Sequence, residues 1–229
     1  MNGFNTPGPV TRLEKVTKIF DGSGHPTTAV RDVSFEARRG EMVLLLGPSG
    51  SGKTTLLTLV AGLTRPTSGS ISLFGKNVEE YSATELQSIR AEKIGFVFQT
   101  FLLIDSLTAT ENIEIVLRFN GKRRAERTGK TRALLGELGI EYLAGRFPRA
   151  MSQGEKQRVA IARAIANDAE LLIADEPTGS LETRQAVDII ALLHGQAKTR
   201  NTTVIVASHD LRLKEFADRT LRLQDGMMG

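Results

Sequence analysis

The sequence predicts an α/β protein with a mostly parallel β-sheet core, an antiparallel β-subdomain near the N-terminus and a helical subdomain inserted within the core. Three observations predict this fold. Strand and helix patterns alternate in the last third of the chain, which favours parallel strands joined by crossovers. Residues 41–46 (EMVLLL) form a short apolar run, typical of a strand buried on both faces. A length of 229 residues is enough for one large core.

The first third of the chain predicts an open sheet followed by the first crossover. Half-exposed strands are expected at residues 10–17 and 30–37, with residues 25–28, which include Pro26, as the turn between them. The buried strand at 41–46 precedes a helix at 53–62, which Gly62 ends as a C-cap. A turn at 66–69 then leads into a strand at 70–74.

The rest of the chain predicts a helical region and a return to the core. Residues 81–163 are mostly helical, apart from a short strand at 94–98. The elements expected after them are strands at 170–174, 203–207 and 220–223 and helices at 182–197 and 211–216. We therefore predict a single domain over 1–229, in which the helical subdomain occupies about residues 81–165.

Composition excludes several classes of protein. The chain has no cysteine, which excludes a disulfide scaffold, thiolate zinc sites and a cysteine nucleophile. Its apolar runs are only a few residues long, whereas a bilayer span needs about 20, and residues 1–10 lack the basic start and apolar core of a secretion signal. The net charge of +4 is too small to predict nucleic-acid binding.

One segment matches a known phosphate-binding pattern at every fixed position. The segment Gly47-Pro48-Ser49-Gly50-Ser51-Gly52-Lys53-Thr54 fits G-x-x-x-x-G-K-[ST] and lies between a buried strand and a helix. Its glycines allow the backbone to aim N–H groups at an anion, and Thr55 continues the helix start. Lys53 supplies a positive charge for the β- and γ-phosphates, and the Thr54 hydroxyl is a hard ligand for Mg²⁺. The motif predicts nucleotide binding without choosing among kinases, GTPases and transport ATPases.

Two carboxylates follow the apolar strand at 170–174. Asp175 is placed to hold the Mg²⁺ shell, because the C-terminal ends of parallel strands border the ligand crevice. Glu176 lies one residue further, where a base can orient an attacking water. Since adjacent strand residues point to opposite faces, the two acids are expected to have different roles.

A self-capped helix start precedes residues 156–166. Ser152-Gln153-Gly154-Glu155 has the Ser-x-x-Glu spacing of a capping box. The segment is therefore explained by helix capping alone. A helix N-terminus with a glycine in its first turn also presents free N–H groups to an anion.

The order of these motifs resembles one family over nearly the whole chain. The phosphate loop, Phe98-Gln99, MSQGEKQR, LLIADEPTGSLE and ASHD follow one another as in the nucleotide-binding subunits of ABC transporters. The piece ADEPTG and residues 98–112 resemble the lipoprotein-release and macrolide-export branch. The resemblance implies ATP and Mg²⁺ as cofactors and an ATP-dependent head-to-tail homodimer as the working form.

The resemblance also implies roles for individual residues. Phe20 would stack on adenine, although a core phenylalanine at a strand end is the structural alternative. Gln99 would reach Mg²⁺ and the attacking water, and His209 would contact the γ-phosphate. Residues 152–155 would clasp ATP bound to the second copy, and residues 179–182 would meet their counterpart across the dimer.

Two positions depart from the family pattern. The usual signature is L-S-G-G-Q, and Gln153 stands where its first glycine is expected. This side chain would either crowd the phosphate site or add a donor. Glu182 stands where Asp is usual, so it keeps the carboxylate with one more methylene.

The function implied is ATP hydrolysis that drives a separate integral membrane permease, from the inner face of the cell membrane. A groove near residues 99–105 would receive the permease, and no nucleic-acid partner is expected. The alternatives are a cell-division-type regulator and a non-transport ABC ATPase. Non-transport ABC ATPases usually carry two fused nucleotide domains, or a coiled-coil or zinc insertion. One predicted domain, no cysteine and no long heptad stretch count against that alternative. A small-molecule kinase would leave Ser152–Glu155 and His209 unexplained.

Residues 118–132 carry the one strong local charge bias. Seven basic side chains in this stretch oppose only Glu126: Arg118, Lys122, Arg123, Arg124, Arg127, Lys130 and Arg132. A solvated helix face explains the pattern. The alternative, which the pattern favours less than a solvated face, is a surface held near anionic lipid or an acidic partner loop.

Overall fold

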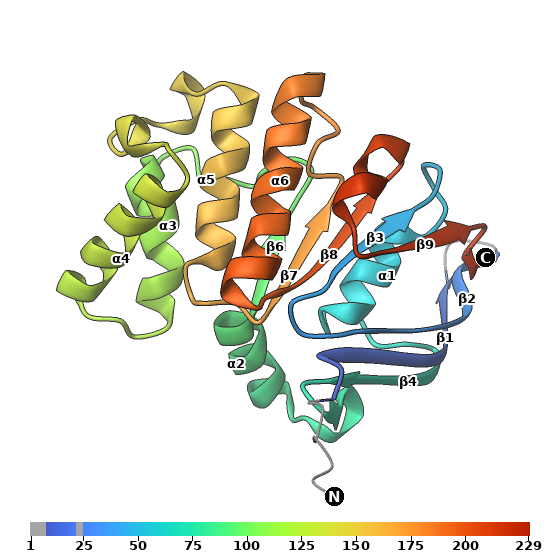
Figure 1. Ribbon diagram of the computed structural model, residues 1–229. Helices are drawn as coiled ribbons and strands as arrows, with labels where there is room; N and C mark the ends of the chain where they lie inside the picture. The colour runs from blue at the N-terminus through green and yellow to red at the C-terminus, as the bar shows by residue number, and fades with distance from the viewer. Residues whose placement is uncertain (1–7, 22–24) are drawn as a thin grey trace, which may run out of the picture.

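A six-stranded sheet forms the core of the computed structural model, which describes residues 8–21 and 25–229. Its strand order is β10-β9-β3-β8-β7-β6. The strands are β3 (Met42–Leu46), β6 (Ile94–Val97), β7 (Leu171–Asp175), β8 (Thr203–Ser208), β9 (Arg219–Gln224) and β10 (Met227–Met228). All neighbours pair in parallel except β9 and β10. The predicted mostly parallel core is confirmed (Figure 1).

The two faces of the sheet pack against different partners, because successive strand residues alternate in direction. In β3, Val43 and Leu45 pack with α1 (Lys53–Val60) and the N-terminal strands. Met42, Leu44 and Leu46 join the opposite cluster, with α3 (Ala109–Phe119), α5 (Gln153–Ile165) and α6 (Thr183–Arg200). Figure 1 shows α5 and α6 on the near face of the sheet and α1 behind it. Because both faces are covered, every residue of β3, β7 and β8 is buried.

The N-terminal strands form a second, antiparallel sheet in the order β2-β1-β4-β5. Its strands are β1 (Thr11–Asp21), β2 (Pro26–Ala37), β4 (Ser68–Leu73) and β5 (Lys76–Asn77). The predicted turn at 25–28 is wrong, because Pro26 pairs with Asp21 and Thr27 with Phe20 as the start of β2. Proline is compatible with the first residue of a strand. Residues 22–24 of this connection lie outside the described part.

The helical region contains α2 (Ala83–Lys93), α3, α4 (Arg124–Glu137) and α5. Short 3₁₀ turns accompany these helices at Val78–Glu80, Glu141–Leu143 and Pro148–Ala150. Three of the helices start with a complete capping box, formed by Ser82 with Glu85, Thr108 with Glu111 and Ser152 with Glu155. Strand β6 lies within residues 81–165 but pairs with β7 of the core sheet.

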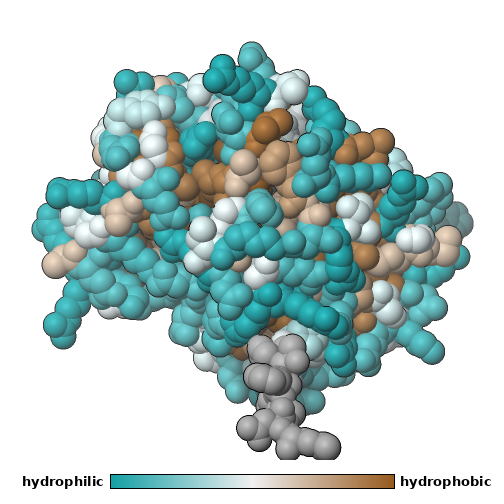
Figure 2. Space-filling view, in the orientation of Figure 1, coloured by the Kyte–Doolittle hydropathy of each residue, from teal (hydrophilic) through white to brown (hydrophobic). Residues whose placement is uncertain are grey.

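The C-terminal part returns to the sheet with one element more than the sequence predicts. The segment Leu211–Phe216 forms a 3₁₀ helix between β8 and β9, and the chain then turns at Gly226, with φ of 77°, into β10. The expected final strand is β9, so β10 is an addition. None of the helices in 8–21 and 25–229 has the length and apolar character of a bilayer span. Figure 2 shows a mostly hydrophilic face with apolar side chains between the polar ones.

Candidate functional site

The phosphate loop joins the end of β3 to the start of α1 and requires glycine at specific positions. A Cβ at Gly52 would lie 2.2 Å from the Ala29 carbonyl oxygen, and its φ of 98° is left-handed. A Cβ at Gly47 would lie 2.2 Å from the Leu223 carbonyl oxygen. A Cβ at Gly50 would have no atom within 4 Å, so glycine is favoured there only by its left-handed φ of 80°. The loop therefore fits closely against β2 and β9 and keeps an open side at Gly50.

Lys53 has its ammonium at the centre of this loop. Its Nζ donates to the carbonyls of Gly47 at 2.8 Å and Pro48 at 3.0 Å. It also lies 3.3 Å from Oε1 of Glu176. The side chain is only 6% exposed, so the charge acts within the loop rather than in bulk solvent.

Asp175 faces α1 because it shares a face of β7 with Leu171 and Ile173, which pack on that side. Its Oδ2 accepts a 2.7 Å hydrogen bond from the Thr54 hydroxyl. The pKa of the Asp175 carboxyl is raised above its usual value, mainly by burial and further by the nearby Glu176 charge. The Thr54 hydrogen bond offsets part of this rise. The buried Oδ1 has no hydrogen-bond partner.

These two oxygen ligands fit a magnesium ion bound together with nucleotide phosphates. A buried carboxylate oxygen without a partner is an available ligand, and a threonine hydroxyl lies beside it. The residues described contain no group of three or more His, Asp and Glu side chains able to hold a metal. A Mg²⁺ ion held by Thr54 and Asp175 would take its other ligands from phosphate and water, which this ion prefers.

Replacing Asp175 with Asn is expected to raise the melting temperature of the nucleotide-free protein by about 2–4 °C, which corresponds to roughly 1 kcal/mol for a chain of this size. The substitution removes a buried charge and keeps an acceptor for Thr54. A carboxyl whose folded-state pKa is raised costs stability above that pKa, and the cost is relieved as pH falls through it. The difference between the proteins should therefore shrink from pH 7 towards pH 4.

Differential scanning fluorimetry across this pH range makes the measurement. Asp188→Asn, at an exposed position on α6, is the control for loss of a carboxylate at the surface. A destabilised Asp175→Asn protein, or a temperature difference that grows on acidification, would contradict the assignment of a buried, costly charge.

Glu176 lies beyond the end of β7 and not on the strand. Its φ is 45°, and its backbone N–H donates to the Ala207 carbonyl at 2.9 Å. The expectation that strand alternation separates Asp175 from Glu176 is therefore wrong, since a left-handed residue, not the pleat, redirects the second acid. Glu176 Oε2 lies 3.0 Å from Nδ1 of His209, which follows β8. The Glu176 carboxylate thus lies between Lys53 and His209.

Gln99 lies against the turn that follows Glu176. A Cβ at Gly179 would be 3.4 Å from Nε2 of Gln99, and the Gly179 N–H donates to the Glu176 carbonyl at 3.1 Å. The fold therefore brings Lys53, Thr54, Gln99, Asp175, Glu176 and His209 together from β3–α1, β6, β7 and β8.

An open cavity of about 450 Å³ extends from the phosphate loop. Besides Gly50, Gly52, Lys53, Thr54 and Thr55, it is lined by residues 27–29 of β2 and by Asp225 and Gly226. No local motif marks these additional residues, which approach the loop only through the tertiary fold. Phe20 does not line this cavity. It pairs with Thr27, is 45% exposed and lies under the Lys18 ammonium, 5.0 Å from the ring centroid.

The predicted signature segment lies at a different cavity. Ser152 Oγ accepts from the Glu155 N–H, and Glu155 accepts from the Ser152 N–H at 2.7 Å, so the capping box is confirmed. Ser152, Gly154 and Glu155 line an open cavity of about 400 Å³ with residues of α6, and Gln153 is exposed in the first turn of α5. This cavity shares no lining residue with the phosphate-loop cavity.

Arg163 on α5 is a residue that the sequence pattern did not indicate. Its guanidinium donates to the carbonyls of Leu102 at 2.5 Å and Phe101 at 2.8 Å. Both of these residues have positive φ, 61° for Phe101 and 46° for Leu102. Arg163 therefore holds the strained loop after Gln99 against the helix that begins with the signature segment. Burial lowers the pKa of Arg163.

Replacing Arg163 with Ala is expected to accelerate amide exchange in residues 98–105 by at least about tenfold, because two hydrogen bonds from a charged donor are lost. The rate kcat of ATP hydrolysis should fall while KM for ATP stays constant, since Gln99 moves but the phosphate loop does not. Hydrogen-exchange mass spectrometry and steady-state kinetics make the two measurements.

Arg127→Ala is the matched control, because Arg127 on α4 also donates to a backbone carbonyl, that of Lys122 at 2.8 Å. Arg163→Lys should recover part of the protection. Unchanged exchange in residues 98–105 after Arg163→Ala would contradict a positioning role for this side chain.

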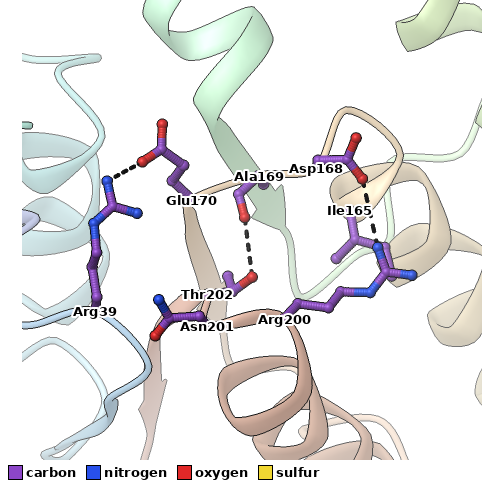
Figure 3. A pocket seen from close by; sticks show the side chains of 8 residues that line it. All are labelled: Arg39, Ile165, Asp168, Ala169, Glu170, Arg200, Asn201 and Thr202. Carbon is purple, nitrogen blue, oxygen red and sulfur yellow. Dashed lines mark hydrogen bonds and ion pairs between the residues drawn. The ribbon is translucent and has the colours of Figure 1, made fainter.

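A further polar cavity, of about 320 Å³, lies at the opposite edge of the sheet, where β3, β7 and β8 begin (Figure 3). Its charged side chains neutralise one another: Arg39 pairs with Glu170, and Arg200 lies 3.6 Å from Asp168. Thr202 Oγ1 donates to the Ala169 carbonyl at 3.1 Å. These bonds join the segments before the strands and explain the cavity as structural.

Comparison with known proteins agrees with this geometry. Residues 30–179 match the family model described as ABC transporter. The chain is 38% identical over 215 residues to the putative hemin import ATP-binding protein HrtA of Staphylococcus haemolyticus, covering 94% of this chain and 97% of that protein. It is 39% identical over 222 residues to the macrolide export ATP-binding/permease protein MacB of Rhodospirillum rubrum, covering 97% of this chain but 34% of that protein. The chain thus spans about a third of that MacB relative.

Solved structures show the same fold. A dimeric, post-hydrolysis form of the ATP-binding cassette MJ0796 bound to ADP and Pi superposes with a TM-score of 0.88 at 36% identity, over 95% of this chain and 96% of that chain. The cbiO1 subunit of Clostridium perfringens gives a TM-score of 0.86 at 27% identity, over 96% of this chain and 87% of that one. With its phosphate loop, carboxylate pair and sheet arranged as described, the chain belongs to the ABC transporter family, as an ATP-binding cassette ATPase.

Proposed function

We propose that this ATPase works with Mg²⁺ as the energising subunit for a separate integral membrane permease of the lipoprotein-release/macrolide-export type. Two copies would close head to tail on ATP and separate after hydrolysis, at the inner face of the cell membrane. The working unit would be a single domain, 1–229, in which the helical subdomain of about residues 81–165 moves with the signature segment.

The chemistry assigned is attack of water on the γ-phosphate. Lys53 and the loop N–H groups would offset the charge that develops on the phosphate oxygens. Glu176 would polarise the water, and His209 would hold Glu176 through its Nδ1. Thr54, Asp175 and Gln99 would hold Mg²⁺, which supplies charge neutralisation when bound. Phe20, exposed and paired with Thr27 of the cavity lining, would offer its ring to adenine.

One observation carries the dimer proposal: the phosphate loop and Ser152–Glu155 line separate cavities of the same chain. A helix N-terminus that presents N–H groups is an anion site, and here its cavity shares no lining residue with the phosphate-loop cavity of the same chain. A second copy in the opposite orientation would supply it. The dimeric neighbour MJ0796, bound to ADP and Pi, supports this arrangement.

A groove between α2 and α3, which we name the α2–α3 groove, supports permease docking. It has a volume of about 580 Å³ and is the most apolar of the cavities described, lined also by β6, Arg163 and the loop after Gln99. Leu102 and Ile104 line it and remain 53% and 41% exposed. An apolar groove next to Gln99 would let an inserted permease segment act on the catalytic residues.

The permease type is the finer part of the proposal. The R. rubrum relative named for macrolide export supports it, and so does the ADEPTG segment at 174–179. HrtA of S. haemolyticus, named an ATP-binding protein and matched over 97% of its length, supports an ATPase subunit that works with a permease on another chain.

Site-specific photocrosslinking in membranes tests this function. A crosslinking amino acid at Leu102 is expected to form an adduct with an integral membrane protein, to be identified by mass spectrometry. Leu63 is the control, since it is 52% exposed but does not line the groove. Hydrolysis of ATP by the purified chain shows that the protein is active. If such an active protein gave no membrane-protein adduct at Leu102, or gave the same adduct at Leu63, permease docking would be refuted.

A further inference from the structure

The turn between α3 and α4 presents cations around an exposed aromatic ring. Phe119, the last residue of α3, is 82% exposed, more than the other large exposed apolar side chains of the described residues. Arg118 precedes it, Arg123 is the N-cap of α4 and Arg124 is the first residue of that helix, and all three are exposed. Hydrophilic side chains project from the lower left of Figure 2, where this connection lies in the orientation of Figure 1.

Only some of the basic side chains at 118–132 are free of ion pairs in the structure. Lys122 pairs with Glu126 at 2.9 Å, Arg127 with Glu114 at 3.9 Å, and Lys130 with Asp168. Glu126 is therefore not the only opposing acid, because Glu114 and Asp168 approach from outside the stretch. Within the described residues, Arg118, Arg123, Arg124 and Arg132 have no carboxylate within 4.0 Å.

The free cations of the turn lie beside the α2–α3 groove. Phe119 and Asn120 line that groove, and Asn120 Nδ2 donates to the Ala91 carbonyl of α2 at 2.8 Å. Arg118, Arg123 and Arg124 line none of the cavities described above. The cations therefore lie on a projecting turn at one end of the proposed permease-docking surface.

We propose that this turn, consisting of Arg118, Phe119, Arg123 and Arg124, binds the anionic lipid headgroups of the membrane that holds the permease. That the turn faces the membrane rests on the proposed function, in which the permease docks in the α2–α3 groove. Long, unpaired cations on a projecting turn can reach many phosphates of a flat lipid layer at once. An acidic protein segment would instead be held in a groove, and these cations line none of the cavities described above. An exposed phenylalanine among them suits the boundary between headgroups and acyl chains.

Vesicle binding tests the proposal without any permease, so its failure leaves the docking proposal standing. The purified chain is sedimented with vesicles of phosphatidylcholine containing 30 mol% phosphatidylglycerol, and with phosphatidylcholine alone. Binding is expected only to the anionic vesicles and should weaken with salt. Each surface cation contributes about fivefold, so Arg118→Gln, Arg123→Gln and Arg124→Gln together should weaken partitioning by about 100-fold. Phe119→Ser should weaken it separately.

A second triple variant controls for net charge. Lys15→Gln, Arg65→Gln and Lys214→Gln remove three exposed cations elsewhere and should leave binding nearly unchanged. The turn variant should keep its melting temperature, since Arg123 forms no side-chain bond as the N-cap of α4. Equal binding to both kinds of vesicle, or equal losses for the two triples, would overturn the proposal. A third result would also overturn it: the parent chain does not bind vesicles, and the turn variant loses the permease crosslink. That result would assign the turn to an acidic protein partner.

Discussion

Glu176→Gln is expected to bind ATP, to accumulate as a dimer and to hydrolyse ATP at least about 100-fold more slowly than the parent protein. Glutamine keeps the shape of the side chain and one acceptor oxygen but cannot take a proton from water. In the structure the carboxylate lies 3.3 Å from the Lys53 ammonium and 3.0 Å from His209, so its charge is positioned within the site. With hydrolysis stopped, the proposed ATP-bound dimer would have no route to separation.

Two measurements examine this variant: phosphate release at saturating ATP and sedimentation velocity with ATP and Mg²⁺. Glu215→Gln, at an exposed position of the Leu211–Phe216 helix, controls for loss of one carboxylate. Normal turnover by Glu176→Gln, or a monomer that persists with ATP and Mg²⁺, is incompatible with the role assigned to Glu176.

Lys53→Ala is expected to have the second large effect, a loss of hydrolysis of about 1,000-fold or more together with weaker ATP binding. The ammonium is 6% exposed and is held by the Gly47 and Pro48 carbonyls, so no neighbouring cation can replace it. Its loss also leaves the Glu176 carboxylate, only 13% exposed, with His209 as its remaining partner.

Isothermal titration with ATP and a phosphate-release assay separate these two effects. Lys214→Ala removes an exposed lysine away from the loop and serves as the control. If Lys53→Ala retained both its ATP affinity and more than a tenth of the parent turnover, the phosphate loop would not be the catalytic site.

Periodicity and motif spacing predicted the core and most of the site. The continuous apolar runs identified β3, β7 and β8, which are buried on both faces as expected. Strand position also predicted that Asp175 lies at the C-terminal edge of the sheet, and the structure adds its hydrogen bond with Thr54. These features depend on local sequence and on general rules of parallel sheets.

The remaining features depend on contacts between distant segments. The positive φ of Glu176 accompanies the turn to Gly179 and the hydrogen bond to Ala207 of β8, and strand alternation did not predict it. Asp225 and Gly226 reach the phosphate loop because β10 turns back towards β2, and no motif marks them. Arg163 could be recognised only once the loop carbonyls that it binds were placed.

The two departures from the family pattern stand at exposed positions. Gln153 is exposed in the first turn of α5, next to Gly154. Glu182 is the N-cap of α6 but makes no side-chain capping bond, so its carboxylate is available to other groups. Neither residue distorts the helix that it begins.

The central claim is that the signature segment of one chain completes the ATP site of another, and Gln153 offers a direct measurement. Adding Gln153→Glu to the Glu176→Gln chain places a negative charge at a helix N-terminus, which stabilises α5 but repels the phosphates of ATP held by the partner. Sedimentation velocity with ATP and Mg²⁺ should show a dimer for Glu176→Gln alone and with Gln153→Ala, but a monomer with Gln153→Glu, at unchanged ATP affinity. A Gln153→Glu chain that dimerises as strongly as the Gln153→Ala control would contradict the account.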